Sequence, residues 1–131
     1  MSRTPAAALR YAGCWHGVGA GLVALILWAS LWPLPPETQW FAGVDKIEHF
    51  LAYAVLVLWW AQVRPRQRMA VLMLACALGT GLEWAQHYVP GRSMDWRDGV
   101  ANILGAFAGL ALARTRVGSL VTWLDRRLQG R

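Results

Sequence analysis

Ten polar side chains recur at helical spacing along three stretches of the chain and could together bind a ligand or transfer protons. They are Asp45, Lys46, His49, Tyr53, Glu83, Gln86, Arg92, Asp95, Asp98 and Asn102. In the first stretch, Lys46, His49 and Tyr53 follow the spacing i, i+3, i+7, and the last three of the ten repeat it. Residues at this spacing share one face of a helix, so each stretch presents a polar stripe.

Three of these residues are candidates for catalysis. His49, Glu83 and Asp98 could carry protons, and Lys46 and Arg92 could contact an anionic group. The alternative is a satisfied hydrogen-bond network that only pins helix ends. Some acidic residues near the helix starts would then be simple caps, because a carboxylate is stabilising there. The convergence of so many different side chains favours a binding site over this structural alternative.

A metal site built from His49, Glu83 and Asp98 is conceivable, but a single histidine on one helix lacks the ligand spacing of a zinc motif. The sequence therefore predicts no metal and no cofactor. Ser93 is the nearest hydroxyl nucleophile, and its place in a loop favours a role in a turn.

The elements that carry these residues must lie in a membrane. The 131 residues are 56% hydrophobic and 15% charged, whereas a soluble domain carries about 25% charge. The net charge of +6 could suggest a nucleic-acid partner. In a membrane chain, however, basic residues mark the cytoplasmic side and contact anionic lipids, so we expect no nucleic acid.

The apolar stretches predict an all-α membrane protein, a bundle of four transmembrane helices in one domain over residues 1–113. The expected spans are about 11–34, 45–63, 69–88 and 95–113, since a spanning helix needs about 20 mostly apolar residues. Glycine stripes on the first span (Gly13, Gly17, Gly21) and the last (Gly105, Gly109) predict close approach of a neighbouring helix. Polar residues crowd one end of the last three spans.

The charges predict the orientation of these spans. Sorted by the loops that the spans define, ten basic residues fall on one side and three on the other. The three are Lys46, Arg92 and Arg97. The positive-inside rule then predicts that both termini are cytoplasmic and that the polar stripes lie near the outer face of a bacterial inner membrane.

Residues 114–131 form a basic cytoplasmic tail. Leu120, Leu124 and Leu128 lie four apart with Arg126 and Arg127 between them, which is typical of an amphipathic helix on the inner leaflet. A soluble, partly frayed segment is an equal alternative because the stretch is short.

The motifs of the polar stripes resemble the VanZ family of small membrane proteins. Its pattern has D-K-x-x-H-F-x-x-Y opening one span, E-x-x-Q ending the next and R-x-x-D-x-x-D-x-x-x-N entering the last. Here these read Asp45 to Tyr53, Glu83 to Gln86 and Arg92 to Asn102. The resemblance covers roughly positions 45 to 109. It implies an integral membrane protein related to a factor for low-level teicoplanin resistance, with no established reaction.

Three functions remain open at this point. The chain could bind a lipid-linked cell-wall precursor or another anionic ligand in the cell envelope, in contact with membrane lipids. It could be a membrane enzyme that modifies such a ligand by acid–base chemistry, or a structural and assembly partner. The sequence leaves the oligomeric state open.

Overall fold

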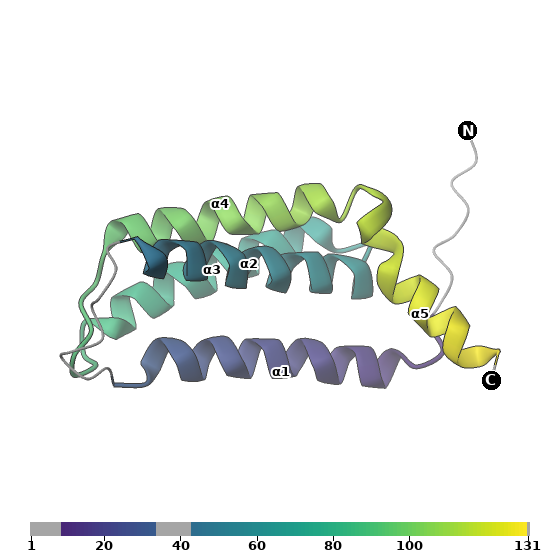
Figure 1. Ribbon diagram of the computed structural model, residues 1–131, viewed down its shortest axis with the longest axis horizontal. Coiled ribbons are helices and arrows are strands. Elements are labelled where there is room, and N and C mark those ends of the chain that lie inside the picture. The colour runs from purple at the N-terminus through teal and green to yellow at the C-terminus, as the bar shows by residue number, and fades with distance from the viewer. Residues whose placement is uncertain (1–8, 34–42, 131) are drawn as a thin grey trace.

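The computed structural model describes residues 9–33 and 43–130, and these residues form helices joined by turns, with no strand among them. Four long helices run alternately in opposite directions (Figure 1). They are α1 (Ala12–Leu31), α2 (Val44–Val63), α3 (Arg68–Gln86) and α4 (Trp96–Leu112). The prediction of an all-α chain is confirmed, and the predicted ranges of the last three helices agree with the observed ones to within two residues.

Two helices, α1 and α3, are long and apolar enough to cross a membrane. A third candidate is α4 joined to the helical segment Arg116–Gln129, if this pair, bent by 72°, counts as one span. By the same criterion α2 does not qualify, because Asp45, Lys46 and Glu48 lie in its first turns. The chain therefore has two or three helices suited to crossing a membrane, and four spans remain a prediction.

The core lies where α2 packs against α3 and α4. Tyr53 and Val57 from α2 are buried there together with Leu72 from α3 and Ala106 from α4. Helices α2 and α4 approach each other so closely that a Cβ at Gly105 would collide with the backbone oxygen of Phe50. A Cβ at Gly109 would likewise meet the backbone of Ala54. The predicted close packing along this glycine pair is confirmed.

The first helix packs loosely, and its predicted glycine contact is wrong. A Cβ at Gly13, Gly17 or Gly21 would meet nothing within 4 Å. The contact is made instead by Gly19, where a Cβ would lie 2.7 Å from the Trp60 ring. The neighbouring indoles of Trp59 and Trp60 on α2 need a position on α1 that carries no side chain, and Gly19 provides it. This contact sets the rotation of α1, so the predicted glycine stripe faces outward. Only Trp15, Gly19 and Ser30 of α1 are buried.

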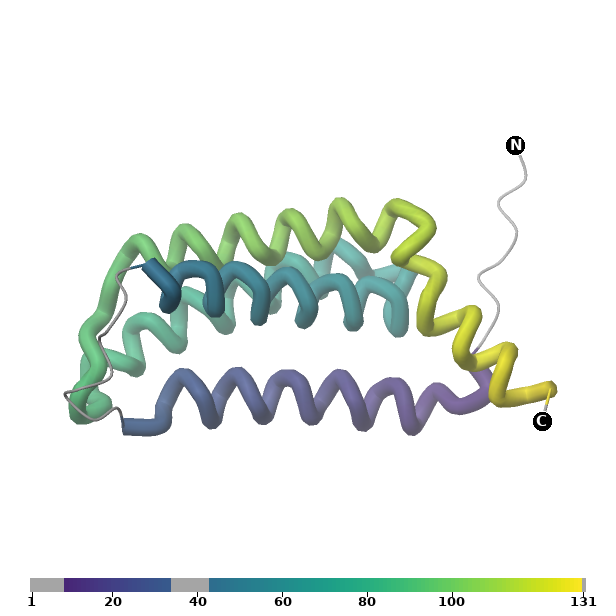
Figure 2. Tube along the Cα trace, viewed as in Figure 1, coloured from purple at the N-terminus to yellow at the C-terminus, as the bar shows by residue number. Residues whose placement is uncertain are grey.

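The tail forms a short 3₁₀ helix, η2 (Arg116–Ser119), followed by α5 (Leu120–Gln129), which turns away from α4 (Figure 2). The buried face of α5 carries Val121 and Asp125. Of the three leucines in the predicted stripe, Leu120 and Leu128 are each 47% exposed, whereas Leu124 is partly buried and packs against the cluster of Trp15, Val63 and Val121. The helical alternative for the tail is confirmed, while its contact with a membrane remains a prediction.

Hydrogen bonds to Asp125 connect α5 to the start of α1. Its carboxylate accepts hydrogen bonds from the Trp15 indole (2.7 Å) and from the backbone amides of Arg10 and Tyr11 (2.9 and 3.0 Å). Burial raises the pKa of this carboxyl, but these hydrogen bonds outweigh burial and hold the pKa at about 2. The α2–α3 turn, which begins after the C-cap Arg64 of α2, lies at this same end of the bundle (Figure 1). The starts of α2 and α4, which carry the polar stripes, lie at the opposite end.

Candidate functional site

Lys46 is the hub of an ion-pair network at the polar end of the bundle. Its ammonium lies 3.0 Å from Asp45, 3.1 Å from Asp95 and 3.0 Å from Asp98. Asp45 is its neighbour on α2, whereas the other two carboxylates belong to the start of α4. The side chain of Lys46 is 31% exposed, so the network reaches the surface. Three carboxylates surround one cation, which leaves this site with excess negative charge.

Asp95 also starts α4. Its side chain accepts a hydrogen bond from the Arg97 amide at 2.9 Å, as an N-cap residue does. That hydrogen bond and the one from Lys46 hold the pKa of the Asp95 carboxyl below its ordinary value. Asp95 is thus one of the acidic residues near the helix starts that cap a helix, and the same carboxylate also joins the ion-pair network.

Deeper in the bundle, His49, Glu83 and Asn102 meet from three different helices. His49 Nδ1 lies 3.0 Å from Asn102 Oδ1, and the Asn102 amide donates to Glu83 Oε1 at 3.4 Å. His49 also lies 3.6 Å from Glu83 Oε1 and 4.0 Å from Asp98 Oδ2. The imidazole therefore sits between two carboxylates, and Asp98 links this cluster to Lys46.

Small residues allow these helices to come close enough for short side chains to touch. A Cβ at Gly79 on α3 would lie 3.1 Å from the Asn102 side chain and 3.2 Å from the Tyr53 ring. A Cβ at Gly99 on α4 would lie 3.8 Å from Glu83. The distances at Gly79 are tighter than an ordinary contact, so a larger residue there would push α3 away from α2 and α4, whereas 3.8 Å at Gly99 is an ordinary van der Waals contact.

The cluster leaves two buried polar atoms unpaired. Tyr53 Oη and Glu83 Oε2 have no hydrogen-bond partner among the described residues. Tyr53 is 2% exposed and Glu83 5%. A buried polar atom without a partner costs about 1–3 kcal/mol. Such atoms are uncommon in a network that serves packing alone.

Two of the predicted site residues turn away from this cluster. Gln86 donates to the backbone oxygen of Ser30 at 3.1 Å. The guanidinium of Arg92 donates to the backbone oxygens of Trp32, at 2.9 Å, and of Ala29. Both side chains thus bind the C-terminal end of α1, where the last carbonyls of a helix lack partners within the helix. Their acceptors are backbone atoms, which carry no signal in a sequence.

His49, Glu83 and Asp98 are also the group that could hold a metal ion. One potential ligand atom from each lies within 4.8 Å of the other two. Glu83 and Asp98 are buried and His49 is partly buried. The three come from α2, α3 and α4, which explains why no compact ligand motif appears in the sequence.

The family comparison follows the same elements. The family model described as VanZ/LLP1 matches residues 12–119, from the start of α1 to the end of η2. The chain belongs to the VanZ/LLP1 family. The resemblance drawn from the motifs of the polar stripes is thereby confirmed and extends to the first helix. Neither a curated protein nor a solved structure matches the chain.

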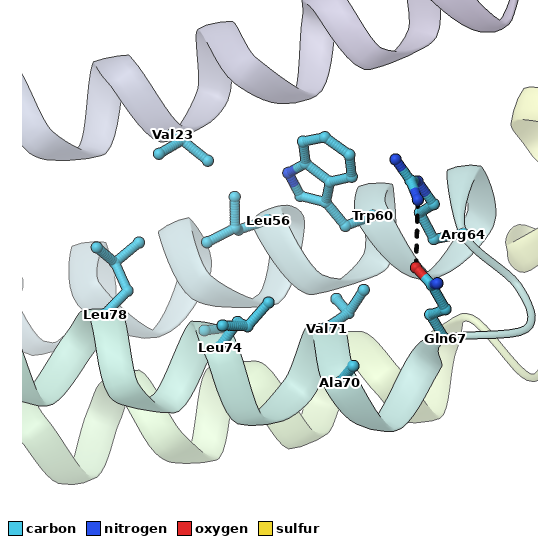
Figure 3. A pocket seen from close by; sticks show the side chains of 10 residues that line it. Val23, Leu56, Trp60, Arg64, Gln67, Ala70, Val71, Leu74 and Leu78 are labelled. Atoms are coloured by element: carbon cyan, nitrogen blue, oxygen red, sulfur yellow. Dashed lines mark hydrogen bonds between the residues drawn. The ribbon is translucent and has the colours of Figure 1, made fainter.

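This VanZ/LLP1 chain also has a cavity away from the polar cluster, towards the α2–α3 turn. An apolar cavity of about 460 Å³ lies between α1, α2 and α3 (Figure 3). Val23, Leu56 and Trp60 line it, and Arg64 and Gln67 close one side, joined by a 3.3 Å hydrogen bond. Its lining offers no catalytic side chain comparable to the His49 cluster, so the candidate site of the VanZ/LLP1 chain is the polar end.

Proposed function

We propose that this membrane protein binds a lipid-linked or other anionic ligand of the cell envelope at the polar end of its bundle. The observation that carries the proposal is the incomplete hydrogen bonding of Tyr53 and Glu83. A network that served only to hold helices together would satisfy its buried atoms, because leaving them unpaired destabilises the fold. A bound ligand would supply the missing partners.

The composition of the site indicates which ligand groups fit. Lys46 is partly exposed and could contact a phosphate, while the carboxylates beside it accept hydrogen bonds from hydroxyl or amide groups. A lipid-linked sugar or peptide precursor offers all of these groups. The positive-inside rule argues that this end faces outward, where the headgroup of such a lipid would be reached from the outer leaflet.

Binding can be tested on the full chain in lipid nanodiscs. The probe is a fluorescent polyprenyl pyrophosphate, and phosphatidylglycerol serves as the competing anionic lipid. We expect Asp98→Asn, which keeps the shape and removes the charge, to weaken probe binding at least tenfold with near-normal folding, because Asp98 holds the Lys46 ammonium in place at 3.0 Å. His87→Gln is the matched control, because His87 is exposed outside the cluster. Equal probe binding by Asp98→Asn and wild type would overturn the proposal.

A membrane enzyme acting by acid–base chemistry is the second candidate. It is favoured by His49, whose imidazole lies 3.6 Å from Glu83 and 4.0 Å from Asp98, since an imidazole between carboxylates suits proton transfer. An enzyme would convert the probe into a product that mass spectrometry detects. His49→Ala would then abolish conversion and retain binding, whereas in an assembly partner His49→Ala and Glu83→Ala would lower only stability.

Protection against teicoplanin is the phenotype that the family resemblance suggests. The assay is the minimum inhibitory concentration of teicoplanin in a sensitive bacterium that expresses the chain. Under the binding proposal, Asp98→Asn loses any protection that the wild type confers, at equal protein level in the membrane. Retained protection with this variant would separate the phenotype from the site.

A further inference from the structure

The hydrogen bonds of Asn102 fix which nitrogen of His49 is free. Glu83 Oε1 as a carboxylate can only accept, so the Asn102 atom that faces it is the amide nitrogen. Asn102 Oδ1 then faces His49 Nδ1, which must donate its proton. In the neutral imidazole, which is the form that binds metal ions, His49 Nε2 then carries the free lone pair. A second hydrogen bond that sets the tautomer of a histidine in this way is typical of metal ligands.

Each carboxylate likewise keeps one oxygen free. Asp98 gives Oδ1 to Lys46, so its Oδ2, 4.0 Å from His49 Nε2, is available. Glu83 accepts from Asn102 at Oε1, and its buried Oε2 has no partner among the described residues. Three lone-pair donors from three helices thus remain unused. The residues that carry them are close together, because one potential ligand atom from each lies within 4.8 Å of the other two.

We propose that His49, Glu83 and Asp98 bind a divalent transition-metal ion such as Zn²⁺. One nitrogen and two carboxylate oxygens are ligands that zinc accepts, at distances of about 2.0–2.2 Å. One potential ligand atom from each residue lies within 4.8 Å of the other two, so side-chain movement without rearrangement of the helices would bring the three residues onto one ion. The charge also fits, because Glu83 adds a fourth carboxylate to the three around Lys46, and a divalent ion offsets this excess.

The role that we assign to the ion rests on the proposed function, in which the polar end binds an anionic ligand. Three protein ligands leave a fourth position open, as in zinc sites that bind a substrate or water. A phosphate or pyrophosphate oxygen of the ligand could take that position. This would explain how an anionic group is held although Lys46 is already shared among three carboxylates and Arg92 binds carbonyls of α1.

Metal binding can be measured on the purified full chain, first stripped with a chelator and then loaded with Zn²⁺ and desalted. We expect about one zinc per chain by mass spectrometry of the metal, with three protein ligands. Co²⁺ in place of zinc should give visible absorption bands. Glu83→Gln and His49→Gln should each weaken zinc affinity at least tenfold. His16→Gln and His87→Gln are matched controls and should bind as the wild type does.

The outcomes separate this inference from the proposed function. The metal site is overturned if the wild type holds far less than one zinc ion per chain. It is also overturned if the zinc affinity is unchanged in both His49→Gln and Glu83→Gln. Circular dichroism shows whether a variant is folded, and the Co²⁺ bands of the wild type test the site without any variant. Zinc binding without capture of polyprenyl pyrophosphate contradicts only the binding function. Capture that is equal with and without the chelator contradicts only the role of the metal ion in holding the ligand.

Discussion

Asn102 Oδ1 on α4 lies 3.0 Å from Nδ1 of His49 on α2, so one amide fixes the orientation of the imidazole. The same amide donates to Glu83 on α3. A single buried side chain therefore connects the three helices that carry the site.

Replacing Asn102 with leucine should destabilise the protein by about 1–3 kcal/mol, because His49 and Glu83 each lose a buried hydrogen-bond partner. Thermal unfolding in detergent measures the loss. Asn102→Ala, which leaves room for water, should cost less than leucine if the lost hydrogen bonds are the cause. A melting temperature equal to wild type for Asn102→Leu would contradict the hydrogen bonds described.

Gly105→Ala should destabilise the bundle by about 1–3 kcal/mol, because overpacking forces two backbones apart. The added methyl would collide with the Phe50 carbonyl. Gly21→Ala is the control, since a Cβ there meets nothing within 4 Å and alanine favours a helix over glycine by about 1 kcal/mol. Thermal unfolding of both variants checks the prediction, and equal losses would show that α2 and α4 are not in close contact.

The docking of α5 should depend on pH through Asp125. The folded pKa of about 2 lies below the ordinary value of 3.8, so the carboxylate stabilises the docked helix fully above about pH 4. This stabilisation is lost as the pH falls through about 2, when the carboxyl is protonated in both states. Hydrogen exchange of the Leu120–Gln129 amides should increase across this window. Asp125→Asn should show little change there, and a wild type equally insensitive would contradict the contact.

The predicted orientation can be tested with fusions. Alkaline phosphatase is active only outside the cytoplasm, so we expect no activity when it follows Arg131 and activity when it is inserted between residues 88 and 95. The reason is the excess of basic residues on the side of the termini. Active phosphatase at the C-terminus would reverse the orientation and place the His49 cluster on the cytoplasmic side.

Local order in the chain was sufficient to predict the helices, the polar stripes and the family. Apolar runs and polar residues at i, i+3 and i+7 are properties of neighbouring residues, and so is the glycine pair on α4 that packs against α2. Lys46, His49, Glu83, Asp98 and Asn102 could be named in advance because they crowd one end of otherwise apolar spans. Such a position is costly in a membrane unless the side chain has a partner.

Which of these residues meet was decided only by tertiary packing. Arg92 and Gln86 occupy the same polar end, yet they bind carbonyls of α1, because a helix end attracts donors wherever it lies. The rotation of α1 was set by Trp60 against Gly19 rather than by its glycine stripe. The convergence of His49, Glu83 and Asp98 needs three helices at fixed rotations and depths, and contacts between distant segments leave no periodic trace in one sequence.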